Sequence, residues 1–170
     1  MAERNAVAYP AAGVRLPLSA APAEYTMDAT SLAALPLCPQ PGSAKVARDF
    51  AISVLRTWGL HDLLPDVSLV VSELVTNAVR HGLRGLAAEP VPLPSPEVPA
   101  PIRLSMLLQG SRLRCEVIDP SDVMPVRLEA DEDAEIGRGL HLVAALSWEW
   151  GATLLAGGGK CVWAVMRGST

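Results

Sequence analysis

In the run AKVARDFAISVLRTW, apolar residues recur at the spacing of an amphipathic helix. Val46, Phe50 and Val54 lie four residues apart, so they would share one face of a helix. Ser43 stands directly before the run and is a candidate N-cap, because its hydroxyl can accept a backbone hydrogen bond at a helix start. A turn at Gly59 would end the segment. We therefore predict a first helix over this run.

Two further helices and several strands follow from the same kind of pattern. A second helix is predicted from Asp66 to Gly82, and a third from about Gly137 through LHLVAALSW. Strand-like runs occur in IRLSMLLQ and RLRCEVID, joined by a turn at Gly110, and in a terminal hairpin made of ATLLA, GGGK and CVWAVM. A weak edge strand is predicted within residues 27–42, where prolines interrupt it.

The order of these elements is helix, helix, strands, helix, strands. It indicates an α+β fold, a two-layer sandwich with three main helices on one face of a mixed, mostly antiparallel sheet. We expect residues 27–170 to form a single domain. Residues 1–26 are rich in alanine and proline and are expected to form a disordered tail. Residues 85–101, with six prolines from Pro90 to Pro101, are expected to form a loop.

The composition is that of a globular protein. Of the 170 residues, 50% are apolar and 19% are charged, and the formal net charge is −4. The sequence has no basic stripe, which argues against a nucleic-acid partner, and no apolar run approaches the ~18 residues of a membrane span. The three cysteines match no zinc or redox spacing, and Cys115 and Cys161 lie in apolar strand-like runs. We therefore expect a cytoplasmic protein with reduced thiols.

The helix from Asp66 to Gly82 carries the first candidate chemistry. Glu73, Asn77 and His81 are spaced by four, so they span only about 80° of the helix surface. The Asn77 carbonyl oxygen can bind Mg²⁺, and Glu73 can accept a proton from an attacking hydroxyl or water. Alternatively, this is the solvated face of an amphipathic helix, and His81 only complements the helix dipole. The core face would carry Val67, Val71, Leu74, Val75 and Ala78.

A strand end and a glycine turn carry the second set of candidate site residues. Asp119 ends the apolar run CEVID, where a carboxylate can accept a hydrogen bond from an exocyclic amine; it can equally be a turn-forming Asp ahead of a proline. Gly137 and Gly139 flank Arg138 at a predicted helix start, followed by Leu140. Glycines let the backbone approach a phosphate, and helix-start N–H groups favour anions. A flexible loop with a solvated arginine is the alternative.

These segments, in this order, resemble motifs of the histidine-kinase-like ATPases, the superfamily also called GHKL or Bergerat-fold. SELVTNAVRHG looks like their first motif, VIDPSD stands at the adenine-binding Asp motif, and GRGLHLVAALSWEWG looks like the glycine motif and its helix. GGGKCVWAVM looks like the closing strand. The resemblance covers roughly residues 43–166. It is closest to small stand-alone ATP-binding regulators similar to anti-sigma-factor serine kinases.

The resemblance implies a role for each matching residue. Glu73 would be the base, Asn77 would hold Mg²⁺, Asp119 would read adenine, and the turn from Gly137 to Leu140 would lie by the phosphates of ATP. Arg48, which matches an arginine in the first helix of the family, would face a protein partner or remain a solvated helix residue. The segment 120–136, which is acidic, would be an exposed, mobile lid over ATP.

The sequence departs from the family at two places. Asp119 is followed by Pro-Ser-Asp where relatives have glycines, so the adenine pocket is expected to differ in shape. Lys160 and Cys161 follow Gly159 where relatives have Gly-Thr, so a hydroxyl contact near adenine is missing. We expect Lys160 to be a solvated turn residue, with a contact to phosphate as the alternative.

The resemblance implies a serine/threonine protein kinase that phosphorylates a small antagonist partner and sequesters a sigma factor, with ATP and Mg²⁺. The alternative is a catalytically silent regulator in which the nucleotide orders the lid and changes a protein-binding surface. Related kinases often dimerise, so a homodimer is an expectation as well. The presence of Glu73 favours the kinase, and the altered surroundings of Asp119 leave the silent regulator open.

Overall fold

The structure is a computed structural model that describes residues 30–81, 102–125 and 138–168. The predicted tail, the proline-rich loop 85–101, Gly137 and the lid beyond residue 125 lie outside the described residues. The described elements, in chain order, are β1 (Thr30–Leu37), α1 (Ser43–Thr57), the 3₁₀ turn η1 (His61–Leu63), α2 (Leu64–His81), β2 (Ile102–Gln109), β3 (Arg112–Asp119), α3 (Arg138–Leu146), β4 (Glu149–Leu154) and β5 (Lys160–Arg167).

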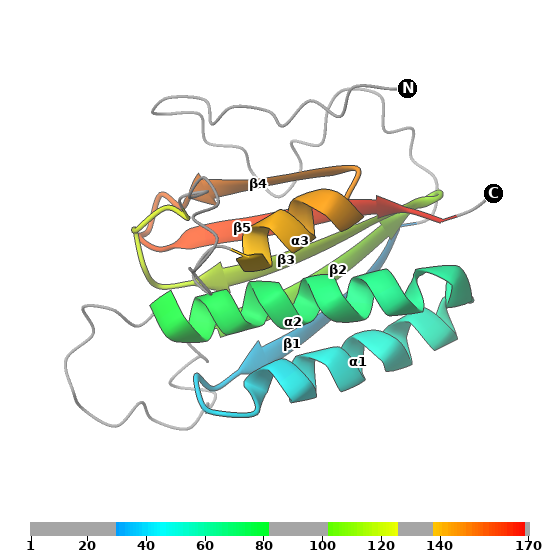
Figure 1. The fold of residues 1–170 in the computed structure, drawn as a ribbon, viewed down its shortest axis with the longest axis horizontal. Helices are drawn as coiled ribbons and strands as arrows, with labels where there is room; N and C mark the ends of the chain where they lie inside the picture. Colours follow the sequence, from blue (N-terminus) through cyan, green and yellow to red (C-terminus); the bar gives the residue numbers. More distant parts are fainter. Residues whose placement is uncertain (1–29, 82–101, 126–137, 169–170) are drawn as a thin grey trace.

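The five strands form one sheet in the order β1-β2-β3-β5-β4. Every pair of neighbouring strands in the described sheet is antiparallel. The three helices lie together on one face of the sheet (Figure 1). The predicted α+β two-layer fold is therefore confirmed, and the sheet expected to be mixed is antiparallel throughout its described part. β1 is an edge strand, as its prolines indicated.

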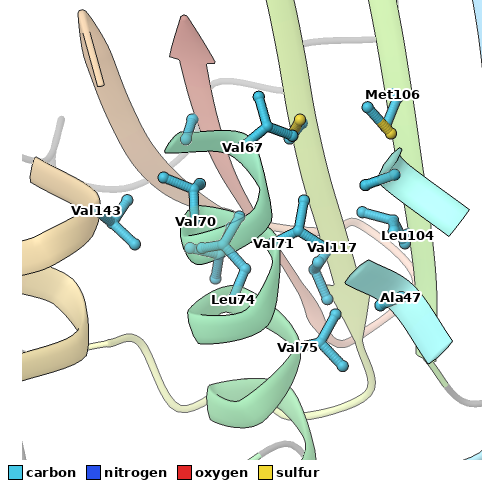
Figure 2. Close-up of a cluster of buried hydrophobic side chains, with 14 of the residues drawn as sticks. Ala47, Val67, Val70, Val71, Leu74, Val75, Leu104, Met106, Val117 and Val143 are labelled. Carbon is cyan, nitrogen blue, oxygen red and sulfur yellow. The ribbon is translucent and has the colours of Figure 1, made fainter. Parts of the chain in front are cut away.

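The core lies between α2 and the sheet. The five α2 residues predicted for the core are all buried: Val67, Val71, Leu74, Val75 and Ala78. In Figure 2, Val71 points toward Val117 of β3, and Val143 of α3 lies on the other side of α2, near Val70 and Leu74. Helix α2 is thus held from two directions, which explains why apolar residues cover so much of its circumference.

The most deeply buried face of α1 lies one residue further along than the apolar spacing of Val46, Phe50 and Val54, although Phe50 and Val54 also pack partly against the core. Val46 is 51% exposed, whereas Ala47, Ala51 and Leu55 are fully buried. A change of one position rotates the buried face by about 100°. The helix presents alanines to the core, and alanines let it lie close to α2 and the sheet.

Several element ends also differ from the prediction. Ser43 is not the N-cap of α1; that position is Gly42, with φ of 99°, and the Ser43 hydroxyl donates to the carbonyl oxygen of Cys38 instead. Helix α2 begins two residues before Asp66, because η1 leads directly into it. Strand β4 begins at Glu149, three residues earlier than predicted. Among the described residues, no helix is long and apolar enough to cross a membrane.

Candidate functional site

Glu73 and Asn77 lie on one side of α2, outside its core face. Both are half-buried, whereas their neighbours Leu74, Val75 and Ala78 are nearly inaccessible. The spacing of four residues places the carboxylate and the amide one turn apart. The alternative of a fully solvated helix face does not hold at these two positions, because α3 lies against this side of α2.

Gly139, in the first turn of α3, is the residue that meets this side of α2. A methyl group at Gly139 would collide with the Oε2 atom of Glu73 and would lie 3.6 Å from Nδ2 of Asn77. Only a residue without a Cβ allows this approach while the Glu73 carboxylate keeps its place. The structure therefore brings together the two side chains predicted from helix spacing and one glycine of the predicted turn.

Asp119 and Lys160 face each other across two neighbouring strands. They are direct partners in the antiparallel pairing of β3 with β5, so their side chains lie on the same face of the sheet. Alternation along β3 and β5 puts both on the face that the helices cover, with the buried residues Val117 and Val162 two positions away. The end of β3, the start of β5 and the C-terminal end of α2 lie at the same end of the molecule (Figure 1).

The prediction of a solvated Lys160 is wrong. Lys160 is 4% exposed and Asp119 is 1% exposed. The Lys160 ammonium donates to Asp119 Oδ1 at 2.8 Å and to the carbonyl oxygen of Ser121 at 3.2 Å. A buried ammonium requires such partners, because leaving a charge unpaired in the interior is strongly unfavourable.

Asp119 also forms a turn, which was the alternative role predicted from the sequence. Its Oδ1 atom accepts the backbone N–H of Ser121 at 2.9 Å, the hydrogen bond of an Asx turn. Asp122 extends the arrangement, because its Oδ1 accepts the backbone N–H of Gly159 at 2.6 Å. Gly159 has φ of 81°, and a Cβ there would meet the Asp119 backbone, so a glycine is required. The described start of the predicted lid, residues 120–125, is thus tethered to β5 and is not a free loop.

The structure describes the remaining predicted site residues only in part. Gly137 lies outside the described residues, and the side chains of His81 and Arg138 are likewise not described, although His81 ends α2 and Arg138 begins α3. Leu140 is buried, 7% exposed, so its side chain belongs to the packing of α3. Arg48 is half-exposed on α1.

The donor set suits a magnesium ion that is bound largely through phosphate. Within the described ranges, no group of three or more His, Cys, Asp or Glu side chains could hold a metal ion. Mg²⁺ usually keeps several waters and takes one or two protein oxygens plus phosphate oxygens. Asn77 can supply one such oxygen. The neighbouring Gly139 has no side chain that would collide with the Glu73 carboxylate.

The buried thiols play no part in this chemistry. Burial raises the pKa of Cys115 to about 12, and the neighbouring Glu116 carboxylate adds to the effect. Burial also raises the pKa of Cys161 to about 12, again with a contribution from Glu116. Both thiols are therefore protonated near neutral pH and act as small apolar side chains, as predicted.

Comparison with protein families gives a match over residues 37–166 to the histidine kinase-like ATPase domain. The chain belongs to this family. Comparison with proteins of curated function gives no match. Among solved structures, the chain resembles the RsbU and RsbW domains of Rv1364c from Mycobacterium tuberculosis, with a TM-score of 0.58 and 24% sequence identity. The similarity covers 82% of this chain and 33% of that chain, so this chain spans about a third of its length.

Within the histidine kinase-like ATPase family, the unexpected feature of this site is Lys160. The sequence places it in a glycine-rich turn, where lysines are usually solvated. Its burial follows from the pairing of β3 with β5, which are separated by α3 and β4 in the chain. Side chains alternate between the two faces along the strand CVWAVM. Lys160 comes two residues before the buried Val162, so the two side chains lie on the same face of the sheet. This alternation is the one local signal of the orientation of Lys160.

Proposed function

We propose that this histidine kinase-like ATPase domain binds Mg-ATP and transfers its γ-phosphoryl group to a serine or threonine of a regulatory protein. The observation that supports this most directly is the close approach of Gly139 to Glu73 and Asn77. A carboxylate can orient an attacking hydroxyl, and an amide oxygen can coordinate magnesium. A glycine at a helix start lets the backbone bind phosphate.

In this proposal each residue has a separate task. Mg-ATP supplies the phosphoryl group and the metal charge that stabilises it. The Asn77 side-chain oxygen binds the magnesium, and the backbone of the α3 start, opened by Gly139, approaches the phosphates. Glu73 accepts the proton of the attacking hydroxyl as the new phosphate ester forms and ADP leaves.

The partners are proposals as well. The similarity to anti-sigma-factor kinases favours a small antagonist protein as the phosphate acceptor and a sigma factor as the sequestered protein. Half-exposed Arg48 on α1 is a candidate contact. The silent-regulator alternative is supported by the Asp119–Lys160 pair, since relatives with active sites of this kind are expected to offer that carboxylate to adenine.

Phosphotransfer with a Glu73→Gln variant separates the two functions. The chain is incubated with ATP labelled at the γ-phosphate, alone and with candidate serine-containing partner proteins. Glutamine keeps the shape of the side chain but cannot accept the proton, so we expect label transfer to fall by a factor of about 100 or more. ATP affinity should stay within about threefold, because the base is not the principal binding group.

The matched control is Glu149→Gln, which removes a half-exposed carboxylate on β4, away from the residues of the site. It should transfer label as the wild type does. Equal transfer by Glu73→Gln and wild type would exclude the base role. No transfer by the wild type to any partner or to water, with intact ATP binding, would support the silent regulator.

A further inference from the structure

The face of the sheet turned away from the helices carries a group of arginines. Along β3, Leu113 and Val117 are buried toward the helices, which lie together on one face of the sheet (Figure 1). Side chains alternate between the two faces along a strand, so Arg112 and Arg114 lie on the other face. Arg167 of β5 is the direct partner of Arg112 in the antiparallel pairing and therefore shares that face.

Two of these arginines lie on tryptophan rings. The central carbon of the Arg114 guanidinium is 4.4 Å from the centroid of the Trp163 ring, and that of Arg167 is 3.7 Å from the centroid of the Trp148 ring. A guanidinium stacks on an aromatic ring through its flat face, whereas its N–H groups lie in its plane and point past the ring. Each ring thus fixes the orientation of a guanidinium without using its hydrogen-bond donors. We call these four residues the arginine–tryptophan patch.

The patch is accessible at its Arg167 end. Trp148 is 63% exposed, and Arg167 is exposed as well. Arg114 and Trp163 are half-buried, and the Nε atom of Arg114 donates to Oε2 of Glu116 at 3.2 Å. Tryptophan and arginine are among the residues that most often dominate the binding energy of protein interfaces. An exposed tryptophan that holds an arginine in place is therefore a candidate anchor for a protein partner.

The charge of this face indicates the chemistry of the partner. The chain has a formal net charge of −4, but the described strands place more positive than negative side chains on this face: Arg103, Arg112, Arg114 and Arg167 against Glu116 and Glu149. Arg112 and Arg167 stand directly opposite each other, where like charges repel. A carboxylate that contacts both side chains would relieve this repulsion, and it can bind a guanidinium through two parallel hydrogen bonds.

We propose that the arginine–tryptophan patch is a docking surface for an acidic segment of a partner protein. Asp119 and Lys160 lie on the opposite face of the sheet, and seven residues of strand, about 23 Å, separate them from the pairing of Arg112 with Arg167. The inference is therefore independent of the proposed nucleotide site, and both sites can be occupied together.

Two other occupants fit this face less well. In a twofold dimer formed through the patch, the arginines of one copy would meet the same arginines of the other, and the like charges would repel. A single-stranded nucleic acid stacks its bases on open aromatic rings. The Trp163 ring contacts Arg114 and packs closely against Gly151 of β4, where an added Cβ would lie 2.7 Å from the ring, so Trp163 is not open to a base.

The experiment measures the fluorescence anisotropy of a short labelled peptide, in which glutamate alternates with serine, during titration with the full chain. We expect it to bind at least about tenfold more tightly than the matched peptide with glutamine in place of glutamate, and its affinity should fall as salt is added. Saturating Mg-ATP should leave the affinity within about twofold, because the patch lies away from the nucleotide site.

Variants of the exposed pair test the anchor. Arg167→Ala and Trp148→Ala should each weaken binding of the glutamate peptide at least about fivefold. Arg167→Lys keeps the charge but loses the flat guanidinium, so we expect a loss of at least about threefold. The matched control is Arg103→Ala, which removes an exposed arginine from the same face at the other end of the sheet and should stay within about twofold of the wild type. Circular dichroism checks the fold of each variant, and if one does not fold, the other substitutions and the two wild-type affinities decide.

Each outcome has a separate meaning. Selective binding of the glutamate peptide that depends on Arg167 and Trp148 supports the inference. Equal affinity for the two peptides would mean that the stacks only stabilise the sheet, and an equal loss in Arg103→Ala would mean that charge alone attracts the peptide; either result would overturn the inference. Tighter binding of a single-stranded oligonucleotide, displacement of the peptide by Mg-ATP, or self-association in sedimentation that Arg167→Ala abolishes would also overturn it, because each assigns a different occupant or a different site.

Discussion

At Gly139 a single methyl group would meet the Oε2 atom of Glu73, and this contact ties the glycine turn to the proposed base. The atom in question is the far end of a flexible side chain, which can rotate away at little cost in stability. The conflict therefore concerns where the Glu73 carboxylate lies and much less whether the protein folds.

Gly139→Ala should separate function from stability for this reason. We expect the free energy of unfolding, measured by urea titration, to change by less than about 1 kcal/mol. Phosphotransfer should fall by a factor of about 100, because a base displaced by about 1 Å no longer reaches the hydroxyl.

Gly157→Ala is the matched control, since a Cβ at Gly157 meets nothing within 4 Å and its φ is not in the left-handed region. This variant should behave as the wild type in both measurements. Full phosphotransfer by Gly139→Ala would mean that the observed position of Glu73 is not the active one.

Individual residues also show which features of the site could be predicted from the sequence and which could not. Glu73 and Asn77 were predictable, because a spacing of four in one helix is local information. Lys160 was not, because its burial depends on the pairing of two strands far apart in the chain. Asp119 was assigned two competing roles from the sequence; the structure places it in the turn, and its role toward adenine remains a prediction.

Among the elements, α1 illustrates a limit of hydrophobic periodicity. The apolar residues at helical spacing include two overlapping stripes, one with Val46 and one with Ala47. The first stripe carries the larger side chains, and Phe50 and Val54 of this stripe pack partly against the core. The structure buries the second, because the helix lies close to its neighbours through alanines.

Leucine substitutions at these two positions test the orientation of α1. Ala47→Leu adds volume at a fully buried position and should lower the free energy of unfolding by about 1–3 kcal/mol. Val46→Leu, at a position that is 51% exposed, should change it by less than about 0.5 kcal/mol. Urea unfolding of both variants gives the comparison. The reverse order of sensitivity would mean that Val46, and not Ala47, faces the core.

The burial of two cysteines in strands β3 and β5 predicts how the thiols react with a thiol reagent. Cys115 and Cys161 are buried in these strands, and burial raises the pKa of each to about 12 from the ordinary value of 9.0. A thiol reagent should therefore label half-buried Cys38 first and the other two only after unfolding. Labelling of all three thiols at one rate in the folded protein would contradict the burial of both strands.

The same pKa shifts set a direction for stability at alkaline pH. In the unfolded chain the thiols lose their protons above pH 9, whereas in the folded chain they keep them until about pH 12. The thiols therefore contribute stability that is complete below pH 9 and is lost as the pH rises toward 12. Urea unfolding of Cys115→Ala and wild type across this range measures the contribution, which should be smaller in the variant.

For the whole molecule, the sequence predicted the layers and the order of elements well. Two-layer packing follows from apolar faces that recur at periods of 3.6 and 2, and these periods are visible in the chain. The strand order is non-local, and the sequence indicated only the two local pairings, β2 with β3 across the turn at Gly110 and β4 with β5 in the terminal hairpin. The histidine kinase-like ATPase family was recognisable because four of its motifs follow one another in a fixed order, on α2, β3, α3 and β5.

The central claim is that α2 and the start of α3 together form a Mg-ATP site, and thermal unfolding with and without Mg-ATP tests it most directly. Ligand at ~100 times its dissociation constant adds about 2.7 kcal/mol of stability. In a chain of this size the unfolding midpoint should rise by roughly 5–10 °C.

Asn77→Ala should unfold near the wild-type temperature without ligand and lose the rise, because Asn77 lies outside the core face of α2. Leu69→Ala, at an exposed position of the same helix, should keep the rise. A Mg-dependent shift present in the wild type and Leu69→Ala and absent in Asn77→Ala is the predicted result. No shift in the wild type, or an equal shift in Asn77→Ala, would contradict the site.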